Sequence, residues 1–269
     1  GLEALYDLFS KAPWLGSLID PHQASADIFR EGFDKLEPLL ASILAAADTD
    51  DAREMAVAAQ GMAKAAEILS KRFSLIATNV PYLAKNKQDF RIQDFCGTHY
   101  PRSSTDLATV FLERILLETD QGGAIAIVSP RIWMTYTAYY ESLRSHLLNS
   151  ISFNSVSHLG KSAFETIGGE IVDVSLLILS RTFRKDQTVS LLTVSDAETP
   201  SDKASALHQS SITCPPQSEF LLTPGSSIVD TFSNTCTLLS HYVECYEGLS
   251  RGDTDRFDRK FWELSRITD

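Results

Sequence analysis

In the stretch SLIATNVPYLAKN, residues 74–86, a short apolar run is followed by the amide of Asn79, the imino acid Pro81 and the phenol of Tyr82. The apolar run is rich in strand-forming residues, and Pro81 cannot continue a central strand, so the sequence predicts a strand that ends just before Asn79. Two interpretations of the Asn-Val-Pro-Tyr segment are open. It can be a simple turn, since Asn and Pro both favour turns. It can also be a site, because α/β sheets bind ligands beyond the carboxyl ends of their strands.

Strands and helices alternate along the chain after Arg72. The expected strands cover residues 73–78, 124–129, 152–159, 172–180 and 189–194. The expected helices between them cover residues 105–119 and 137–149. This alternation is typical of an α/β sheet that helices cover on both faces.

The first part of the chain has helical periodicity. Expected helices cover residues 2–11, 22–46 and 51–71, and Pro38 kinks or breaks the second of them. The third helix is rich in alanine and follows an acidic cap. We therefore expect a helical segment over residues 1–72 that serves packing.

The character of the sequence changes again near residue 196. The stretch DAETPSDKASALHQSS, residues 196–211, is polar, and we interpret it as a linker or surface loop. The expected organisation is therefore the helical segment, a sheet domain over residues 73–195, and a third region over residues 196–269.

Composition places the chain among ordinary globular proteins. It has 269 residues, of which 43% are hydrophobic and 22% are charged. The formal net charge of −11 argues against a protein whose whole surface coats nucleic acid, but it is compatible with a local basic cleft. No run approaches the roughly 18 apolar residues that span a bilayer, and the N-terminus lacks the pattern of a secretory signal. We therefore expect a cytoplasmic protein.

The cysteines are widely spaced along the chain, at Cys96, Cys214, Cys236 and Cys245. They form no Cys-x-x-Cys pair, and no histidine stands at zinc-finger spacing from them. We expect reduced, structural thiols, and the sequence indicates no metal site.

The Asn-Val-Pro-Tyr segment resembles the (Asn/Asp)-Pro-Pro-Tyr motif of the amino-methyltransferases that use S-adenosylmethionine. More closely, the chain is similar to the N6-adenine DNA methyltransferases of fused Type IIG restriction-modification enzymes and of BREX phage-exclusion systems. Three later stretches carry the likeness in order: STDLATVFLERILLETDQGGAIAIVSP (104–130), HLGKSAFETIGGEIVDVSLLILSR (158–181) and GLSRGDTDRFDRKFWE (248–263).

The resemblance implies a fold and a set of site residues. The fold is the C-terminal part of a Rossmann-like methyltransferase sheet, with a helical segment before it. Asn79 and the carbonyl of Val80 accept hydrogen bonds from the adenine amino group, Pro81 holds the loop and Tyr82 stacks on the base. Val80 stands where the family has Pro, so the carbonyl is kept while the loop is less rigid.

Further roles follow from the resemblance, each beside a simpler alternative. Phe164 packs against the flipped adenine, or it is a core residue beside a Gly-Gly turn. Asp106 contacts the cofactor together with Asn79, or it caps the helix that follows it.

Basic residues of the resembling stretches are candidate DNA contacts. Lys161, Arg251 and Arg256 bind phosphates, or they are merely solvated. His99 lies in an expected polar loop, where it approaches DNA or stays in water.

The implied reaction is methyl transfer from S-adenosylmethionine to N6 of adenine in double-stranded DNA, with the adenine extruded from the helix. No Gly-rich turn that could hold the cofactor stands before Phe73. We therefore expect a fragment whose partners are a cofactor-binding part and a target-recognition part of the same polypeptide. Two other functions stay open: a protein glutamine methyltransferase, and a DNA-binding or scaffold module with a silent motif.

Overall fold

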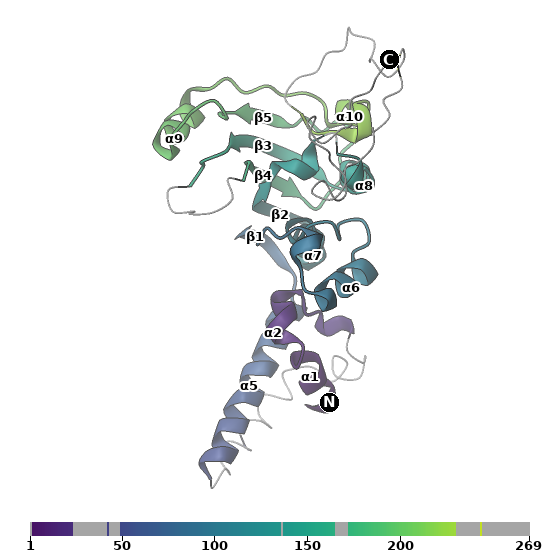
Figure 1. The fold of residues 1–269 in the computed structure, drawn as a ribbon, viewed down its shortest axis with the longest axis vertical. Helices are drawn as coiled ribbons and strands as arrows, with labels where there is room; N and C mark the ends of the chain where they lie inside the picture. The colour runs from purple at the N-terminus through teal and green to yellow at the C-terminus, as the bar shows by residue number, and fades with distance from the viewer. Residues whose placement is uncertain are drawn as a thin grey trace, which may run out of the picture. The chain divides into compact units, whose positions relative to one another are not determined.

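A mixed sheet of five strands in the order β1-β2-β4-β3-β5 organises the described part of the chain in the computed structural model (Figure 1). The strands are β1 (Phe73–Asn79), β2 (Thr119–Pro130), β3 (Ser152–Gly160), β4 (Val174–Ser180) and β5 (Ser190–Thr193). The structure describes residues 2–23, 49–135, 137–164 and 172–229, with residues 42 and 243 as single positions. The chain divides into two units, Gly1–Asp230 and Thr231–Asp269, and all elements named here belong to the first.

Strand direction changes within the sheet. β1 runs parallel to β2 and β3 runs parallel to β5, whereas β4 lies antiparallel between β2 and β3. The expected α/β fold, with a helical segment before the sheet, is confirmed. The antiparallel position of β4 was not predicted, because the periodicity of a strand carries no information on its direction.

Helices pack against the sheet and form the first part of the chain. The α-helices are α1 (Leu2–Phe9), α2 (Ala12–Leu15), α5 (Asp50–Ser70), α6 (Phe90–His99), α7 (Leu107–Glu118), α8 (Glu141–Ser150), α9 (Pro200–Gln209) and α10 (Gln217–Phe220). Short 3-10 turns are η1 (Gly16–Leu18), η2 (Pro21–Gln23), η3 (Lys85–Lys87), η4 (Arg131–Met134), η5 (Ala138–Tyr140) and η6 (Pro224–Ser226). None of the helices in the described ranges is long and apolar enough to cross a membrane.

Most of the predicted helices are present. Those expected over residues 2–11, 51–71, 105–119 and 137–149 correspond to α1, α5, α7 and α8. The helix expected over residues 22–46 lies outside the described residues apart from three positions. The expected cap of α5 is confirmed, since the side chain of Thr49 accepts a hydrogen bond from the Ala52 N–H.

One face of the sheet is well buried. Alternate residues of the central strands, among them Ile125, Ile127 and Leu177, are at most 2% exposed. On the opposite face Ile178 is 47% exposed, and α9 packs near Leu176 at one end of that face. The expected cover on both faces is therefore incomplete within the described residues.

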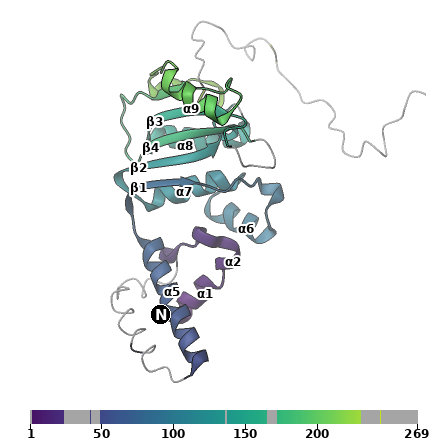
Figure 2. The ribbon, with the colours of Figure 1, turned by 90° about the vertical axis from the view of Figure 1, so that its left-hand side faces the viewer.

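A buried arginine joins the helical segment to α7. Arg114 is 3% exposed, and its Nη2 donates to the carbonyls of Ile19 (2.9 Å) and Leu69 (3.3 Å). Its guanidinium also forms ion pairs with Asp20 (3.3 Å) and Glu118 (2.9 Å). Apolar side chains of α2 and η1 pack against α6 and α7 in the same region. Figure 2 shows α2 beside α6.

The expected polar loop around His99 is wrong. The chain forms helix α6 there, and His99 is its last residue. The helix begins after Asp89, whose side chain accepts a hydrogen bond from the Arg91 N–H (3.0 Å). Cys96 is the one residue of this helix that is fully buried. A ten-residue helix with so narrow an apolar face has too weak a periodicity to be recognised.

The linker or loop expected over residues 196–211 is also wrong. Helix α9 occupies most of this stretch, with Thr199 as its N-cap and Pro200 in its first turn. Its Lys203 is 3% exposed, and the Nζ donates to the carbonyls of Leu159 (2.7 Å) and Ala197 (2.6 Å). The stretch is polar because a single lysine, and not an apolar stripe, makes the main buried contact of the helix.

Candidate active site

Asn79 is the last residue of β1 and lies at the carboxyl end of the strand, where the sequence predicts a ligand site. It stands opposite Val128 of the parallel strand β2, so the carboxyl ends of both strands meet at this edge. Its side chain is exposed. The strand ends here because Pro81, two residues later, has no N–H to donate to a neighbouring strand.

The hydroxyl of Tyr82 donates a hydrogen bond to Oδ1 of Asn79 at 3.3 Å. The phenol also packs beside an apolar cluster whose buried members are Leu159, Val174 and Val194. Burial raises the pKa of Tyr82 to about 12, and the nearby Asp106 carboxylate adds to the rise. The hydroxyl is therefore a protonated donor at every physiological pH.

The loop between these residues is fixed at both ends. Val80, which occupies the position of the first Pro of the family motif, is 6% exposed. Its buried side chain anchors the loop by packing. Beyond Tyr82, the N–H of Leu107 donates to the carbonyl of Leu83 (3.1 Å), and Ala84 forms a bridge with Asp106. These contacts hold the loop against the start of α7.

Asp106 is the N-cap of α7. Its Oδ1 accepts a hydrogen bond from the Ala108 N–H at 2.8 Å, so the capping alternative is confirmed. Burial raises the pKa of the Asp106 carboxyl, while backbone hydrogen bonds from Ala108 and Leu83 act in the opposite direction. Contact with a cofactor stays a prediction for this residue.

Phe164 follows β3 in the chain and is 37% exposed, more than a core residue would be. The preceding residue, Ala163, packs in the same apolar cluster as Tyr82. The structure thus places the segment of Phe164 near that of Tyr82. The proposed contact of Phe164 with a base stays a prediction.

Lys161 is exposed and lines a cavity of about 400 Å³ beyond the carboxyl end of β2. Pro130 and Ile132 of the strand end and of η4 line the same cavity. Arg251 and Arg256, the other two expected phosphate contacts, lie outside the described residues.

A second buried arginine, missed by the sequence interpretation, supports the turns after β2. Arg144 of α8 is fully buried. Its guanidinium donates to the carbonyls of Trp133 (2.9 Å), Thr137 (3.0 Å) and Gly225 (2.7 Å). Desolvation lowers the pKa of Arg144 from its ordinary value. No sequence signal points to this role, because its partners are backbone atoms of three separate segments.

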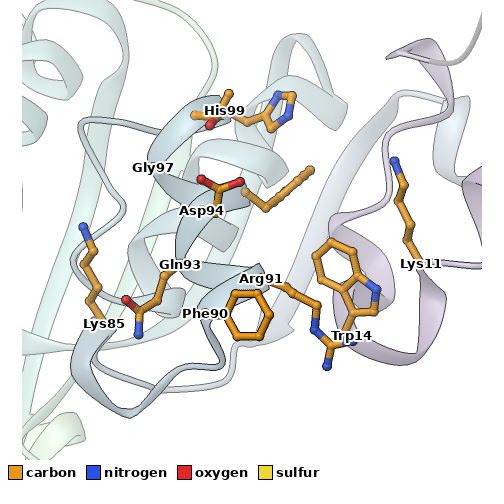
Figure 3. A pocket seen from close by; sticks show the side chains of 11 residues that line it. Lys11, Trp14, Lys85, Phe90, Arg91, Gln93, Asp94, Gly97 and His99 are labelled. Carbon is orange, nitrogen blue, oxygen red and sulfur yellow. The ribbon is translucent and has the colours of Figure 1, made fainter.

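A larger cavity, of about 930 Å³, was also missed (Figure 3). Its lining comes from α2, η3 and α6, and includes Trp14, Lys85, Phe90 and Arg91. The sequence DFR at residues 89–91, an acidic cap followed by an aromatic and a basic residue, was the available signal. It was overlooked because α6 was not predicted.

S-adenosylmethionine, the cofactor that the resemblance implies, needs more than the described residues offer. Gly122 and Gly123 lie within β2 and not at a turn between a strand and a helix. The Asp106 carboxylate already accepts a hydrogen bond from the start of α7. The described residues therefore do not fit S-adenosylmethionine, and the role of Asn79 and Tyr82 toward a target amine stays a prediction.

Comparisons with known proteins identify a family and relatives that are similar to this chain. The model of the Eco57I restriction-modification methylase family matches residues 21–164. The chain is 30% identical over 122 residues to the adenine-specific methyltransferase PglX of Lacticaseibacillus casei (strain Zhang), covering 45% of this chain and 10% of that protein. It is 28% identical over 174 residues to the adenine-specific methyltransferase BrxX of Escherichia coli O9:H4 (strain HS), covering 64% of this chain and 14% of that protein.

Solved structures of restriction-modification proteins are also similar. A modification subunit of a putative type I restriction enzyme from Vibrio vulnificus YJ016 has 16% identity and a TM-score of 0.40, over 54% of this chain and 34% of that chain. The methyltransferase subunit of a type I system from Streptococcus thermophilus has 15% identity and a TM-score of 0.44, over 58% and 37%. The chain therefore spans a small part of the length of its relatives.

Proposed function

The chain belongs to the Eco57I restriction-modification methylase family, and from this premise we propose that the complete protein methylates N6 of adenine in double-stranded DNA. The methyl donor is S-adenosylmethionine, and the protein acts in the cytoplasm as part of a restriction-modification or phage-defence system. The observation that supports this most directly is the contact between Tyr82 and Asn79 at the carboxyl end of β1.

The target adenine first leaves the duplex, because its amine cannot reach a methyl donor inside the base stack. Its amine then donates to Oδ1 of Asn79 and to the carbonyl of Val80. To do so it takes the place of the Tyr82 hydroxyl, which holds that Oδ1 in this structure. The ring of Tyr82 provides a flat surface for the base.

The two acceptors act on the charge that forms during transfer. As the N6 nitrogen bonds to the methyl carbon, positive charge develops on the nitrogen, and both oxygens stabilise it through its N–H groups. The excess proton then leaves for water. When bound, S-adenosylmethionine would supply the methyl group: its sulfonium S–CH3 bond would break as the N–C bond forms, and the bonding electron pair would stay on the departing thioether sulfur. Asn79, with its exposed side chain at a strand end fixed by the sheet, is held ready for this task.

The open edge of β1 supports the proposed partner within the same polypeptide. Among the described residues β1 pairs with β2 on one side, and its other side carries no strand. Leu75 of β1 is 62% exposed. An exposed strand edge with apolar residues is a template for further strands. We propose that the cofactor-binding part of the protein adds its strands there and brings the Gly-rich turn to Asn79.

DNA contacts beyond the target base complete the proposal. Lys161 is exposed beside the cavity that follows β2, in keeping with a phosphate contact. Arg251 and Arg256 have the same proposed role, in a third region over residues 196–269 that begins target recognition. The sheet domain over residues 73–195 is the proposed catalytic subdomain.

Replacement of Asn79 tests the function directly. In the complete protein, Asn79→Ala removes one of two acceptors of the amine, and loss of one such group costs on the order of 100-fold in rate. N6-methyladenine in host DNA, mapped by methylation-sensitive sequencing, is the measurement. Asn149→Ala is the matched control, because Asn149 is exposed on α8 and its amide donates to the carbonyl of Ser145 in the same helix. Unchanged methylation in Asn79→Ala with S-adenosylmethionine present would sink the proposal.

A further inference from the structure

The cavity of about 930 Å³ in Figure 3 has the size of a small-ligand site and is separate from the Asn79 loop. Sites for small molecules and cofactors have volumes of roughly 300–1,000 Å³. None of the residues 79–82 is among those that line it. Its walls come from α2 on one side and from η3 and α6 on the other.

Flat groups line this cavity. The guanidinium carbon of Arg91 lies 5.8 Å from the ring centroid of Trp14 and 5.9 Å from that of Phe90. Phe90 is 74% exposed. A single exposed ring needs no explanation, but an exposed ring next to a guanidinium and a second ring forms a surface on which a planar ligand can stack.

The charges around these rings are mostly positive. Lys85 and Lys11 lie on opposite sides of the rings in Figure 3, and both line the cavity. Within the described ranges neither lysine has an ion-pair partner, whereas Arg91 pairs with Asp89 at 2.9 Å. The carboxylate of Asp94 also lines the cavity. Uncompensated cations are notable in a chain whose formal charge is −11.

We propose that this cavity binds a nucleotide. The base stacks on the ring of Phe90, beside Arg91, and the phosphate lies next to Lys85 or Lys11. Asp94 offers an acceptor for an exocyclic amine or a sugar hydroxyl, so adenine or a ribonucleotide can use it. Aromatic stacking combined with lysine contacts to phosphate is the general chemistry of binding unpaired nucleotides.

Two sources supply this chemistry: a free nucleotide, and an unpaired nucleotide of DNA. The second source rests on the function proposed above. Lys85 follows Tyr82 by three residues, so their Cα atoms are at most about 11 Å apart. A DNA strand with its target adenine at Tyr82 therefore passes close to the cavity.

Two variants of the full-length protein test the site. Phe90→Ala removes the stacking ring from an exposed position, and Lys85→Gln removes one cation. Phe183→Ala and Lys185→Gln are matched controls, since both residues are exposed in the loop between β4 and β5. Circular dichroism verifies that each variant is folded. Fluorescence anisotropy measures binding of labelled dAMP, labelled ATP and a labelled single-stranded oligonucleotide with no adenine.

We expect Phe90→Ala to weaken binding of one class of probe about tenfold, which is the usual effect of losing one stacked base. Lys85→Gln weakens the same probe and reduces the dependence of its affinity on salt. Loss of dAMP or ATP binding identifies a free nucleotide as the occupant, and loss confined to the oligonucleotide identifies a DNA strand. Unchanged affinity for every probe in both variants overturns the site.

The failure of this site is distinguishable from failure of the proposed function. If Asn79→Ala abolishes methylation while Phe90→Ala changes no affinity, the methyltransferase proposal stands and the nucleotide site falls. If Asn79→Ala leaves methylation unchanged, the function falls, and a loss of dAMP or ATP binding in Phe90→Ala still supports the site.

Discussion

The hydroxyl of Tyr82 donates its hydrogen bond to Oδ1 of Asn79, the oxygen proposed to receive the target amine. The hydroxyl therefore occupies the acceptor until a base arrives. Because burial raises the pKa of Tyr82 to about 12, this exchange involves a neutral phenol and no change of charge. Tyr82 therefore has two separate proposed roles: its ring stacks on the base, and its hydroxyl holds Oδ1 of Asn79 while the site is empty.

Separating the ring from the hydroxyl gives the first prediction. Tyr82→Phe keeps the stacking surface and frees Oδ1 of Asn79, so we expect methylation to stay within a few-fold of the parent rate. Tyr82→Ala also removes the ring, which contributes about 1–3 kcal/mol of stacking, and methylation falls much further. Single-turnover methyl transfer by the complete protein measures both. Equal damage in the two variants would contradict a stacking role.

Phe164 provides the second prediction. If its ring contacts the flipped base, Phe164→Ala slows methyl transfer more than it weakens DNA binding, because contacts to the DNA backbone supply most of the affinity. Phe164→Leu keeps apolar area and retains more activity than Phe164→Ala. Rates and affinities measured on the same duplex separate the two effects. A variant that loses thermal stability, but keeps its rate, would assign Phe164 to packing instead.

The ion pairs of Arg114 give the third prediction, for stability. Arg114→Met leaves the carboxylates of Asp20 and Glu118 without their buried cation, and breaking a buried pair costs about 3–5 kcal/mol. We expect a correspondingly lower free energy of unfolding in urea. Arg53→Met is the control, because the ion pair of Arg53 with Asp50 is exposed.

The pH dependence of this loss has a definite sign. Burial raises the pKa of Glu118 in the folded protein, and Arg114 opposes that rise. An acid with a raised folded pKa binds its proton more tightly in the folded state, so stability falls as pH rises from the unfolded pKa through the folded one. Removal of Arg114 raises that folded pKa further. The loss of unfolding free energy caused by Arg114→Met should therefore become smaller as the pH is lowered through the folded pKa of Glu118 towards its unfolded pKa. A deficit that grows on acidification would contradict this assignment.

Lys203 gives the fourth prediction. Its buried ammonium donates to the carbonyls of Leu159 and Ala197, with longer contacts to Val194 and Ser195 at 3.5 Å. Lys203→Met leaves these oxygens without a donor, and each buried group that loses its partner costs about 1–3 kcal/mol. Thermal unfolding should shift down by several degrees.

The effect of Lys203 should also reach the candidate site. Ala206 and Leu207 of α9 pack in the same apolar cluster as Tyr82, so loosening α9 slows methyl transfer as well. Lys185→Met, in the exposed loop between β4 and β5, should change neither stability nor rate. If Lys203→Met unfolds at the same temperature as the parent protein, the hydrogen bonds from Lys203 to these carbonyls do not stabilise the fold.

The sequence was sufficient for the elements with a strong local signal. Apolar runs identified all five strands, and the Asn-Val-Pro-Tyr segment falls at the end of β1 as predicted. What it missed depends on distant contacts. Lys203 is buried by backbone carbonyls and not by an apolar stripe. Tyr82 packs against an apolar cluster whose buried members, Leu159, Val174 and Val194, all lie more than 70 residues later in the chain. Neither contact leaves a periodic trace in the chain.

The bridge between Ala84 and Asp106 brings the two ends of residues 85–105 together beside the candidate active site. Residues 85–105, which include α6, therefore form a loop whose two ends are held together. A change in the length of such a loop costs little in chain entropy. Evolution can therefore remodel this loop, provided that its replacement still fills the core position of Cys96, without moving Asn79 or Tyr82. The cavity beside α6 and the Asn79–Tyr82 loop can therefore change independently, although one continuous stretch of polypeptide carries both.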